Sequence, residues 1–318
     1  MKIKKISTYK YKKNIFQCGE KTIKSKKPSI KSIAGKKIDR FEKYAIKSDT
    51  GQRVLAKIYH SDIYGYLSKK IIEFRDIKLT EEIKQFNVPK HVAIIMDGNR
   101  RFAKNFELAP EAGHIFGRDK IEEVLNWCLE LSIKVLTVYA FSTDNFNRNE
   151  NEVKSLMDLC TDELNRAVKN SKIHKNKVRV RIIGNIESLP EETRTSAKYI
   201  MKSTKEYDKY FFNIALAYGG REEIIDAIKK IADDVKKGNL EIKKISQKTV
   251  SSYLYTNGLP DPDLILRTSG EERISNFLLW QLAYSELYFS DVYWPAFQKR
   301  DFLKAIRTYQ KRKRRYGK

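Results

Sequence analysis

The runs "VLTVYAF" at residues 135–141 and "FFNIALAY" at residues 211–218 are short and almost wholly apolar. A strand with one face in water alternates apolar and polar side chains, whereas a strand that helices cover on both faces is apolar throughout. Both runs therefore predict buried strands of a parallel sheet. Parallel neighbours need a crossover of a dozen or more residues, and the chain around these runs has room for such helices.

Outward from these runs, strand and helix patterns alternate along the chain. The fold class predicted is α/β, with a single domain built on a six-stranded, mostly parallel sheet surrounded by helices. The expected strands are 92–96, 134–141, 178–184, 210–218, 264–268 and 286–290. The expected helices are 114–131, 150–171, 190–207, 221–237, 247–256 and a last one from Lys299.

The net charge of +24 is typical of a basic nucleic-acid-binding protein, which is the first alternative function. The distribution of the charge argues against it. Residues 1–50 hold 16 Lys and Arg against 4 Asp and Glu, and residues 311–318 hold 6 against none, so the middle 260 residues carry only +6. Nucleic-acid binding favours basic and aromatic residues interleaved in the folded region, so we expect no nucleic-acid partner.

The front of the chain differs from the rest. Residues 1–60 are a basic extension, for which a disordered tail, a targeting segment and a tether to an anionic membrane are the alternatives. Residues 61–87 predict a helical lead-in that docks on the domain or lies on a membrane surface. Its apolar stripe is Ile63, Leu67, Ile71, Phe74 and Ile77. No apolar run approaches the roughly 20 residues that cross a bilayer, so we expect a soluble or peripheral protein.

The three cysteines have neither CxxC spacing nor an even count, which indicates reduced thiols rather than disulfides or a zinc site. They are Cys18, Cys128 and Cys160. Cys128 shares one face of helix 114–131 with apolar residues, so we expect it in the core.

Polar residues follow the first predicted strand, and in an open parallel sheet ligands bind just beyond the carboxyl ends of the strands. The segment "MDGNRR" places Asp97 beside Gly98, Arg100 and Arg101. Gly98 lets the backbone turn tightly toward a ligand. An Asp at such a turn commonly caps the next segment. Beside arginines it can also hold a divalent ion while the guanidiniums bind the phosphate oxygens that the ion bridges.

The strand 134–141 is followed by a second polar segment. Ser142, Asn145 and Arg148 supply a hydroxyl, an amide and a guanidinium, and Glu152 is placed to fix the loop. By itself this segment is equally well explained as an ordinary polar loop.

The strand 264–268 leads into the third segment, in which Arg267, Arg273 and Ser275 surround a Ser-Gly turn. Arginine forks and turn amides both suit a phosphate group, and a salt-bridged surface is the alternative. Glu286 lies in an apolar, aromatic stretch, where an unpaired carboxylate costs several kcal/mol. It needs a cation, either an arginine or a metal.

Arginines at three strand ends, with two isolated carboxylates, predict a metal ion and at least two phosphate-rich ligands bound side by side. The sequence lacks the GxxxxGK[ST] loop of nucleotide hydrolases.

Taken in order, these segments resemble the cis-prenyltransferase family, which includes the undecaprenyl and dehydrodolichyl diphosphate synthases. The resemblance covers roughly residues 88–318, which it marks as the catalytic domain. It implies a hydrophobic tunnel and repeated condensation of isopentenyl diphosphate onto an allylic diphosphate, usually farnesyl diphosphate. The product implied is a long-chain polyprenyl diphosphate for dolichol or polyprenol carriers and glycosylation, made with Mg²⁺. The matching stretches are "HVAIIMDGNRRFAK", "GHIFG", "YAFSTDNFNR", "RIIGN", "NIALAYGGREEI", "DPDLILRTSGEERISNFLLWQLAYSELYF" and "RRYG".

The resemblance also implies roles for the matching residues. Asp97 corresponds to the magnesium-binding aspartate, and Glu286 to a second metal-linked carboxylate that is often reached across a dimer. Residues implied for the allylic diphosphate are Gly98, Asn99, Arg100, Arg101 and His114. Residues implied for isopentenyl diphosphate are Arg267, Arg273 and Ser275. Residues implied for the loop between the substrates, where proton loss and orientation are assisted, are Ser142, Asn145 and Arg148. Residues that stand where bacterial members usually carry tryptophan are Phe102 and Phe146.

The end of the chain and one departure complete the resemblance. Arg315 and Gly317 reproduce a terminal Arg-x-Gly motif that closes over the neighbouring subunit's substrate, which implies a homodimer. A non-catalytic partner subunit of the same fold is the second alternative, but such subunits tend to lose the aspartate of "MDGN". Pro110 stands where the family has an arginine four residues before the histidine, which puts the affinity of the allylic site in question.

The resemblance also bears on location. It implies peripheral contact with membranes at the cytoplasmic face of the endoplasmic reticulum, because a polyprenyl product partitions into lipid. The alternative is a plastid-like organelle, if residues 1–60 are a transit peptide.

Overall fold

The computed structural model describes residues 62–312, so the predictions for residues 1–61, for Arg315 and for Gly317 concern positions outside the described part of the chain. From Thr80 onward the described chain forms one compact unit. Helix α4 (Asp62–Lys84) confirms the predicted helical lead-in, and only its last turn belongs to this unit. Within residues 62–312 no helix combines the length and the apolar composition that crossing a membrane requires.

A six-stranded sheet forms the centre of this unit, in the order β3-β4-β2-β1-β5-β6. Every neighbouring pair is parallel, so the sheet is wholly rather than mostly parallel. All six strands lie where the sequence predicted them. Their bounds are β1 (His91–Ile95), β2 (Val135–Tyr139), β3 (Val178–Ile183), β4 (Tyr210–Ala215), β5 (Leu264–Arg267) and β6 (Glu286–Phe289).

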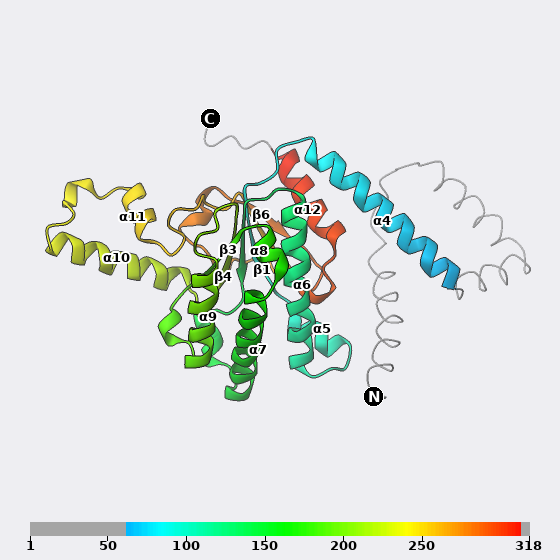
Figure 1. Ribbon diagram of the computed structural model, residues 1–318, viewed down its shortest axis with the longest axis horizontal. Helices are drawn as coiled ribbons and strands as arrows, with labels where there is room; N and C mark the ends of the chain where they lie inside the picture. The colour runs from blue at the N-terminus through cyan, green and yellow to red at the C-terminus, as the bar shows by residue number, and fades with distance from the viewer. Residues whose placement is uncertain (1–61, 313–318) are drawn as a thin grey trace, which may run out of the picture. The chain divides into compact units, whose positions relative to one another are not determined.

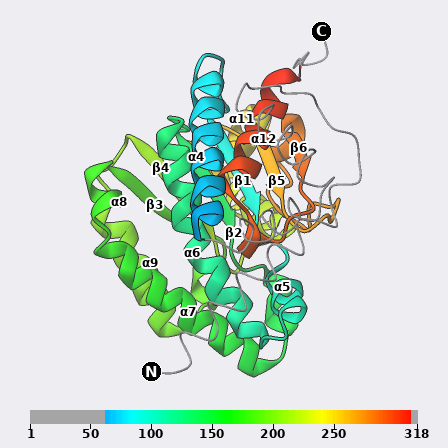
Figure 2. The same ribbon diagram turned by 90° about the vertical axis from the view of Figure 1, so that its right-hand side faces the viewer.

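Helices connect the strands and cover the sheet. Figure 1 shows α10 and α11 on one side of the sheet and α6 and α12 on the other, and Figure 2 shows α6, α7 and α9 running side by side. Their bounds are α5 (Asn99–Asn105), α6 (Pro110–Glu130), α7 (Glu150–Val168), α8 (Ser171–Lys175), α9 (Glu191–Ser203), α10 (Gly220–Lys236), α11 (Gln247–Tyr253) and α12 (Lys299–Lys311).

Two differences from the predicted helices go beyond shifts of a few residues at the helix ends. The helix expected over 150–171 ends at Val168, and the separate short helix α8 follows because the Asn170 side chain accepts a hydrogen bond from the Lys172 backbone N–H and starts a new helix. Helix α5 was not predicted. It has only seven residues and buries only Phe102 and Ala103, which is too short for an apolar period to be visible.

Alternate side chains of the central strands build one part of the core. Ala93 and Ile95 of β1 are buried with Ala215 of β4, and the same cluster contains Phe277 and Leu278. Residues 277 and 278 lie just beyond the polar loop that follows β5, so this packing anchors the loop at the carboxyl edge of the sheet.

Cys128 is buried on α6, as predicted, and burial raises the pKa of its thiol. A buried thiol held in its neutral form is a poor nucleophile. The residue therefore contributes packing rather than chemistry.

A buried polar chain crosses the middle of the sheet. The Nδ1 atom of His91 lies 2.7 Å from the Pro260 carbonyl oxygen, and its Nε2 atom lies 2.8 Å from the Thr137 hydroxyl. Because a carbonyl only accepts, Nδ1 carries the proton and Nε2 accepts from Thr137. Asn213 donates to the same hydroxyl at 2.8 Å. Three strands are thus joined through side chains that are fully buried.

This arrangement predicts a stability that falls on mild acidification. Burial lowers the pKa of His91 from 6.5 to about 4, although the Pro260 carbonyl and the Asp263 carboxylate act in the opposite direction. Between these values the unfolded chain binds a proton that the folded chain does not, so stability is complete above pH 6.5 and is lost as the pH falls. We expect the free energy of unfolding to drop by about 2 kcal/mol between pH 7.5 and 5.0 from this group alone.

Urea denaturation at both pH values checks this expectation. The His91→Gln variant keeps a group that can bond Thr137 but does not titrate, so its stability should change less with pH, by about the same 2 kcal/mol. Identical pH dependence in the two proteins would contradict the assignment.

Candidate active site

The turn between β1 and α5 places Asp97 at the carboxyl edge of the sheet. The Asp97 backbone N–H donates to the Thr268 hydroxyl at 2.9 Å, and that hydroxyl donates back to the Asp97 carbonyl oxygen at 2.7 Å. Gly98 has φ +102°, and a Cβ atom there would lie 2.8 Å from the Tyr293 ring. Only glycine therefore fits this turn, which agrees with the predicted tight turn.

The Asp97 carboxylate lies between two guanidiniums. Its Oδ2 atom is 2.7 Å from Arg267 and its Oδ1 atom is 3.2 Å from Arg101. Burial alone would raise the pKa of the Asp97 carboxyl, but the hydrogen bonds and charges of Arg267 and Arg101 outweigh burial and hold the pKa below its usual value. The group is therefore ionised at neutral pH while its side chain keeps 27% exposure.

Arg267 ends β5 and is held on several sides. Its NH1 atom donates to the Ser275 hydroxyl at 2.8 Å and to the Arg273 carbonyl oxygen. The side chain is only 4% exposed, and its Nε atom is buried without a hydrogen-bond partner among the described residues. The structure thus brings Arg267 and Ser275 together with Asp97, as the sequence predicted.

The loop after β5 has an unusual backbone. Left-handed φ values occur at the non-glycine residues Ser269, Ser275, Asn276 and Leu278, as well as at Gly270. Such conformations cost energy and cluster at sites that bind ligands. The loop turns sharply around the guanidinium of Arg267, consistent with the predicted turn.

Sequence reasoning missed Glu271, which joins the arginines of this group. Its carboxylate accepts from Arg101 at 2.6 Å and from Arg273. Ser269, also missed, accepts from Arg101 at 2.6 Å. The alternation of acid and arginine in "RTSGEER" was the available signal, but it also describes an ordinary surface ion pair.

A second carboxylate, Glu152 on α7, is surrounded by two arginines and a histidine from other positions. It lies 3.0 Å from Arg148, 3.8 Å from Arg100 and 3.9 Å from His114. Burial lowers the pKa of His114, and Arg148 lowers it further, so the imidazole is neutral at neutral pH. The structure confirms that Glu152 fixes the loop carrying Arg148. Arg100 and Arg101, adjacent on α5, link this group to the one around Asp97.

Close packing of α5 on α6 fixes the position of Asn99. A Cβ atom on Gly113 would lie 2.1 Å from the Asn99 carbonyl oxygen, and one on Gly117 would lie 2.4 Å from Asn99 Oδ1. Asn99 Oδ1 and His114 Nε2 are both buried without hydrogen-bond partners among the described residues. Unpaired buried polar atoms are rare in folded proteins, and two of them beside several arginines suit a polar ligand.

The segment after β2 forms a short turn, residues Thr143–Asn147. The Ser142 backbone N–H donates to the Asn145 side-chain oxygen at 3.1 Å, which fixes the orientation of that amide. Phe146 is partly exposed and packs edge-on against Phe141, with ring centroids 4.9 Å apart. Ser142 and Asn145 thus occupy the carboxyl edge, as predicted.

Two predicted site residues lie elsewhere. Phe102 is buried between Phe106 and Phe116, so it packs α5 on α6 and offers no surface to a substrate. Glu286 pairs with Leu264 at the amino end of β5, whereas Asp97 follows the carboxyl end of β1. Its cation is Arg312 at 2.8 Å, one of the two partners that the sequence allowed.

The donor set limits how a metal could bind. Among residues 62–312 no group of three or more His, Cys, Asp or Glu side chains is arranged to hold a metal ion. Mg²⁺ does not need such a cage, because it commonly binds one or two carboxylates and takes its other ligands from water and substrate phosphates. The single ionised carboxylate of Asp97, beside guanidiniums, fits an ion of that kind.

Three comparisons place this geometry among known proteins. A family model described as "Putative undecaprenyl diphosphate synthase" matches residues 95–317. A Thermoplasma volcanium protein named tritrans,polycis-undecaprenyl-diphosphate synthase (geranylgeranyl-diphosphate specific) is 53% identical over 253 residues, 80% of this chain and 97% of its own length. A Methanopyrus kandleri protein of the same name is 52% identical over 249 residues, 78% of this chain and 92% of its own.

The fold is likewise similar to a solved structure. Lavandulyl diphosphate synthase from Lavandula x intermedia, in complex with dimethylallyl diphosphate, superposes with a TM-score of 0.70 and 37% identity. The match covers 73% of this chain and 99% of that one.

Proposed function

The chain belongs to the cis-prenyltransferase family and is a transferase of prenyl groups, and from this premise we propose that it condenses isopentenyl diphosphate repeatedly onto an allylic diphosphate. The observation that carries the proposal is the set of arginines at the carboxyl ends of the strands, where Asp97 lies between Arg101 and Arg267 and α5 also brings Arg100 to Glu152. Arginines on both sides of one carboxylate suit two diphosphates bound side by side.

The allylic diphosphate is assigned to the α5 side of the site. Its departure builds negative charge, which Arg101 and the Asn99 side-chain amide are placed to stabilise as it forms. Mg²⁺ held by Asp97 would supply further charge stabilisation. His114, neutral and with its Nε2 atom unpaired among the described residues, can donate or accept a hydrogen bond there.

Isopentenyl diphosphate is assigned to Arg267, Arg273 and Ser275. Arg267 is too buried to move, so it provides a fixed fork for one phosphate group. Arg273 is 61% exposed and can swing toward the ligand once it leaves Glu271. Ser142 and Asn145, whose turn is held by its own hydrogen bond, are the groups proposed to orient the new allylic carbon and assist loss of its proton.

The allylic primer proposed here is geranylgeranyl diphosphate. The expectation of farnesyl diphosphate and of a dolichol-type product came from the family as a whole. The archaeal relatives reported above are named for geranylgeranyl diphosphate and for an undecaprenyl product, and they cover four fifths of the chain at about half identity. The tunnel that would hold the growing product belongs to this proposal.

A homodimer also belongs to the proposal. Within one subunit Glu286 lies at the amino ends of the strands, whereas Asp97 lies at their carboxyl ends. A role for Glu286 beside the metal therefore requires that it come from a second copy. Asp97 and the strand-end arginines are all present, which supports a catalyst rather than a non-catalytic partner subunit.

Incubation of the purified chain with labelled isopentenyl diphosphate, Mg²⁺ and either primer tests the function. We expect chain elongation from both farnesyl diphosphate and geranylgeranyl diphosphate, with kcat/KM about tenfold higher for geranylgeranyl diphosphate. Chromatography of the products gives their length. The Asp97→Asn chain is the matched negative control. Absence of incorporation with either primer would contradict the proposed function, and equal kcat/KM values would contradict the primer.

A further inference from the structure

Four strands of the sheet are immediately preceded by a lysine. Lys90 precedes β1, Lys134 precedes β2, Lys177 precedes β3 and Lys209 precedes β4. The two remaining strands, β5 and β6, are preceded by Asp263 and Ser285 instead. The function proposed above makes no use of this pattern.

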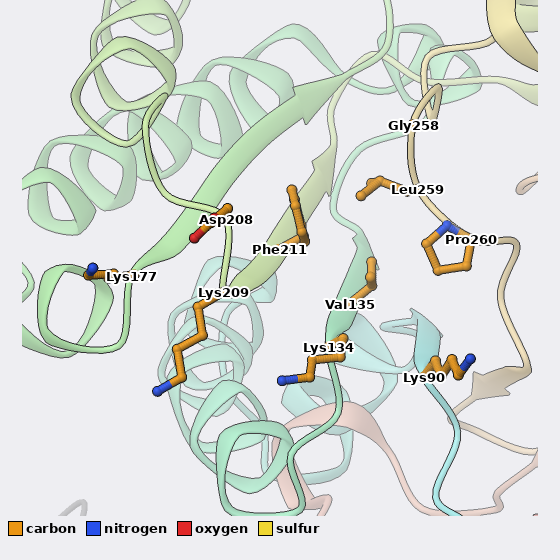
Figure 3. A pocket seen from close by; sticks show the side chains of 10 residues that line it. All are labelled: Lys90, Lys134, Val135, Lys177, Asp208, Lys209, Phe211, Gly258, Leu259 and Pro260. Atoms are coloured by element: carbon orange, nitrogen blue, oxygen red, sulfur yellow. The ribbon is translucent and has the colours of Figure 1, made fainter.

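The sheet order turns this pattern into a row. Because β3, β4, β2 and β1 are consecutive neighbours, their lysines follow one another along the amino edge. Parallel strands lie about 4.8 Å apart, so the row spans about 14 Å at the backbone. Figure 3 shows the four side chains in this order around one depression, from Lys177 past Lys209 and Lys134 to Lys90.

Within the described part of the chain, the ammonium groups of the row have no carboxylate partner. All four lysines are exposed, and none forms an ion pair with another described residue. Instead, Lys134 and Lys209 both lie over the Tyr210 ring, at 4.7 and 5.8 Å from its centroid. Asp208 is the single carboxylate among the residues lining the depression. Like charges held this close repel one another, which an anionic partner would relieve.

The depression combines this charge with apolar surface. Its volume is about 580 Å³, and between the lysines it is lined by Val135, Phe211, Leu259 and Pro260. Lysines around an apolar floor match an anionic lipid, whose phosphate group is charged and whose remainder is apolar. A single-stranded nucleic acid is a poorer match, because it is bound through successive aromatic faces and the described lining supplies one, Phe211.

We propose that this row docks the amino edge of the sheet on the phosphate groups of an anionic lipid bilayer. The choice of a lipid surface rests on the proposed function, whose product is a lipid. The candidate active site lies at the carboxyl edge, about 15 Å away along strands of five or six residues. Docking at the amino edge therefore leaves the diphosphate sites open.

Vesicle binding by the full chain tests the proposal. The variant K90Q/K134Q/K177Q/K209Q removes the row, and its matched control K154Q/K229Q/K236Q/K248Q removes four exposed lysines of α7, α10 and α11 that form no ion pair with described residues. On vesicles of equal parts phosphatidylglycerol and phosphatidylcholine, each surface lysine contributes about fivefold to binding. We expect the row variant to bind on the order of 10²-fold more weakly than the control at low salt.

The outcomes separate the alternatives. Equal binding by the two variants would overturn the proposal, as would a row variant that loses affinity for a single-stranded oligonucleotide but not for vesicles. A prenyl-transfer assay in detergent, run in parallel, should give the same kcat and KM for row variant, control and unaltered chain. Activity without vesicle binding would refute only the docking surface, whereas vesicle binding without activity would refute only the proposed function.

Discussion

Replacing Asp97 by Asn should lower kcat by about 10²-fold or more while changing KM little. The carboxylate is ionised, because Arg267 and Arg101 outweigh its burial, and it is the described group at this edge best suited to hold Mg²⁺. Its contribution grows as the diphosphate leaves, so its loss affects the transition state more than substrate binding. Asn keeps the shape and one acceptor but removes the charge.

Steady-state kinetics at saturating Mg²⁺ measures this effect. Glu271→Gln is the matched control, because it removes a carboxylate that contacts the same Arg101 without removing the proposed metal ligand. If Glu271→Gln lowers kcat as far as Asp97→Asn, the loss comes from releasing Arg101. Near-native turnover by Asp97→Asn would rule out the assignment of Asp97 altogether.

Most of the fold could be predicted because buried parallel strands have a recognisable sequence pattern. Runs such as residues 135–141 are apolar without alternation, and polar residues at their ends mark one edge of the sheet. Asp97, Arg101, Arg267 and Ser275 were found in this way, and they lie together. What predicts a site residue is its position just after an apolar strand, rather than its residue type alone.

What was missed depended on tertiary packing. Phe102 was assigned to the substrate because it stands where bacterial members of the family usually carry tryptophan, but on the short helix α5 it points into the core beside Phe116. Glu286 begins β6, as the sequence placed it, and so lies at the amino end of the strand within one subunit. Whether a second subunit brings it to Asp97 depends on how two chains pack, which no single stretch of the sequence encodes.

Glu152 and Glu271 show a related limit. Each carboxylate holds two or more arginines in place, and the pKa of the Glu271 carboxyl is lowered by Arg273 and Arg101. In sequence Glu271 looks like a solvated acid, and Glu152 was predicted only to fix its own loop. Their importance comes from the convergence of cations from different elements, which makes an anion site rigid before a ligand arrives.

Arg267→Lys should raise KM for isopentenyl diphosphate by about 10-fold to 100-fold, with a smaller change in kcat. Lysine retains the charge but has one nitrogen in place of the planar fork, so it cannot reach Asp97 and Ser275 together with a phosphate. The contact is made before and during the reaction, and its loss therefore appears in binding. This is the opposite pattern from Asp97→Asn.

Varying isopentenyl diphosphate at a saturating allylic primer separates the two constants. Arg181→Lys is the control, because the Arg181 guanidinium is likewise held by more than one acceptor, the carbonyl oxygens of Tyr255 and Asn257, but lies on β3 away from Asp97. Its KM should match that of the unaltered chain. An unchanged KM in Arg267→Lys, or a rise in KM for the allylic primer instead, would show that Arg267 serves the other substrate or only the fold. A rise confined to isopentenyl diphosphate would support placing the two diphosphates on opposite sides of Asp97, whose carboxylate lies between Arg101 and Arg267.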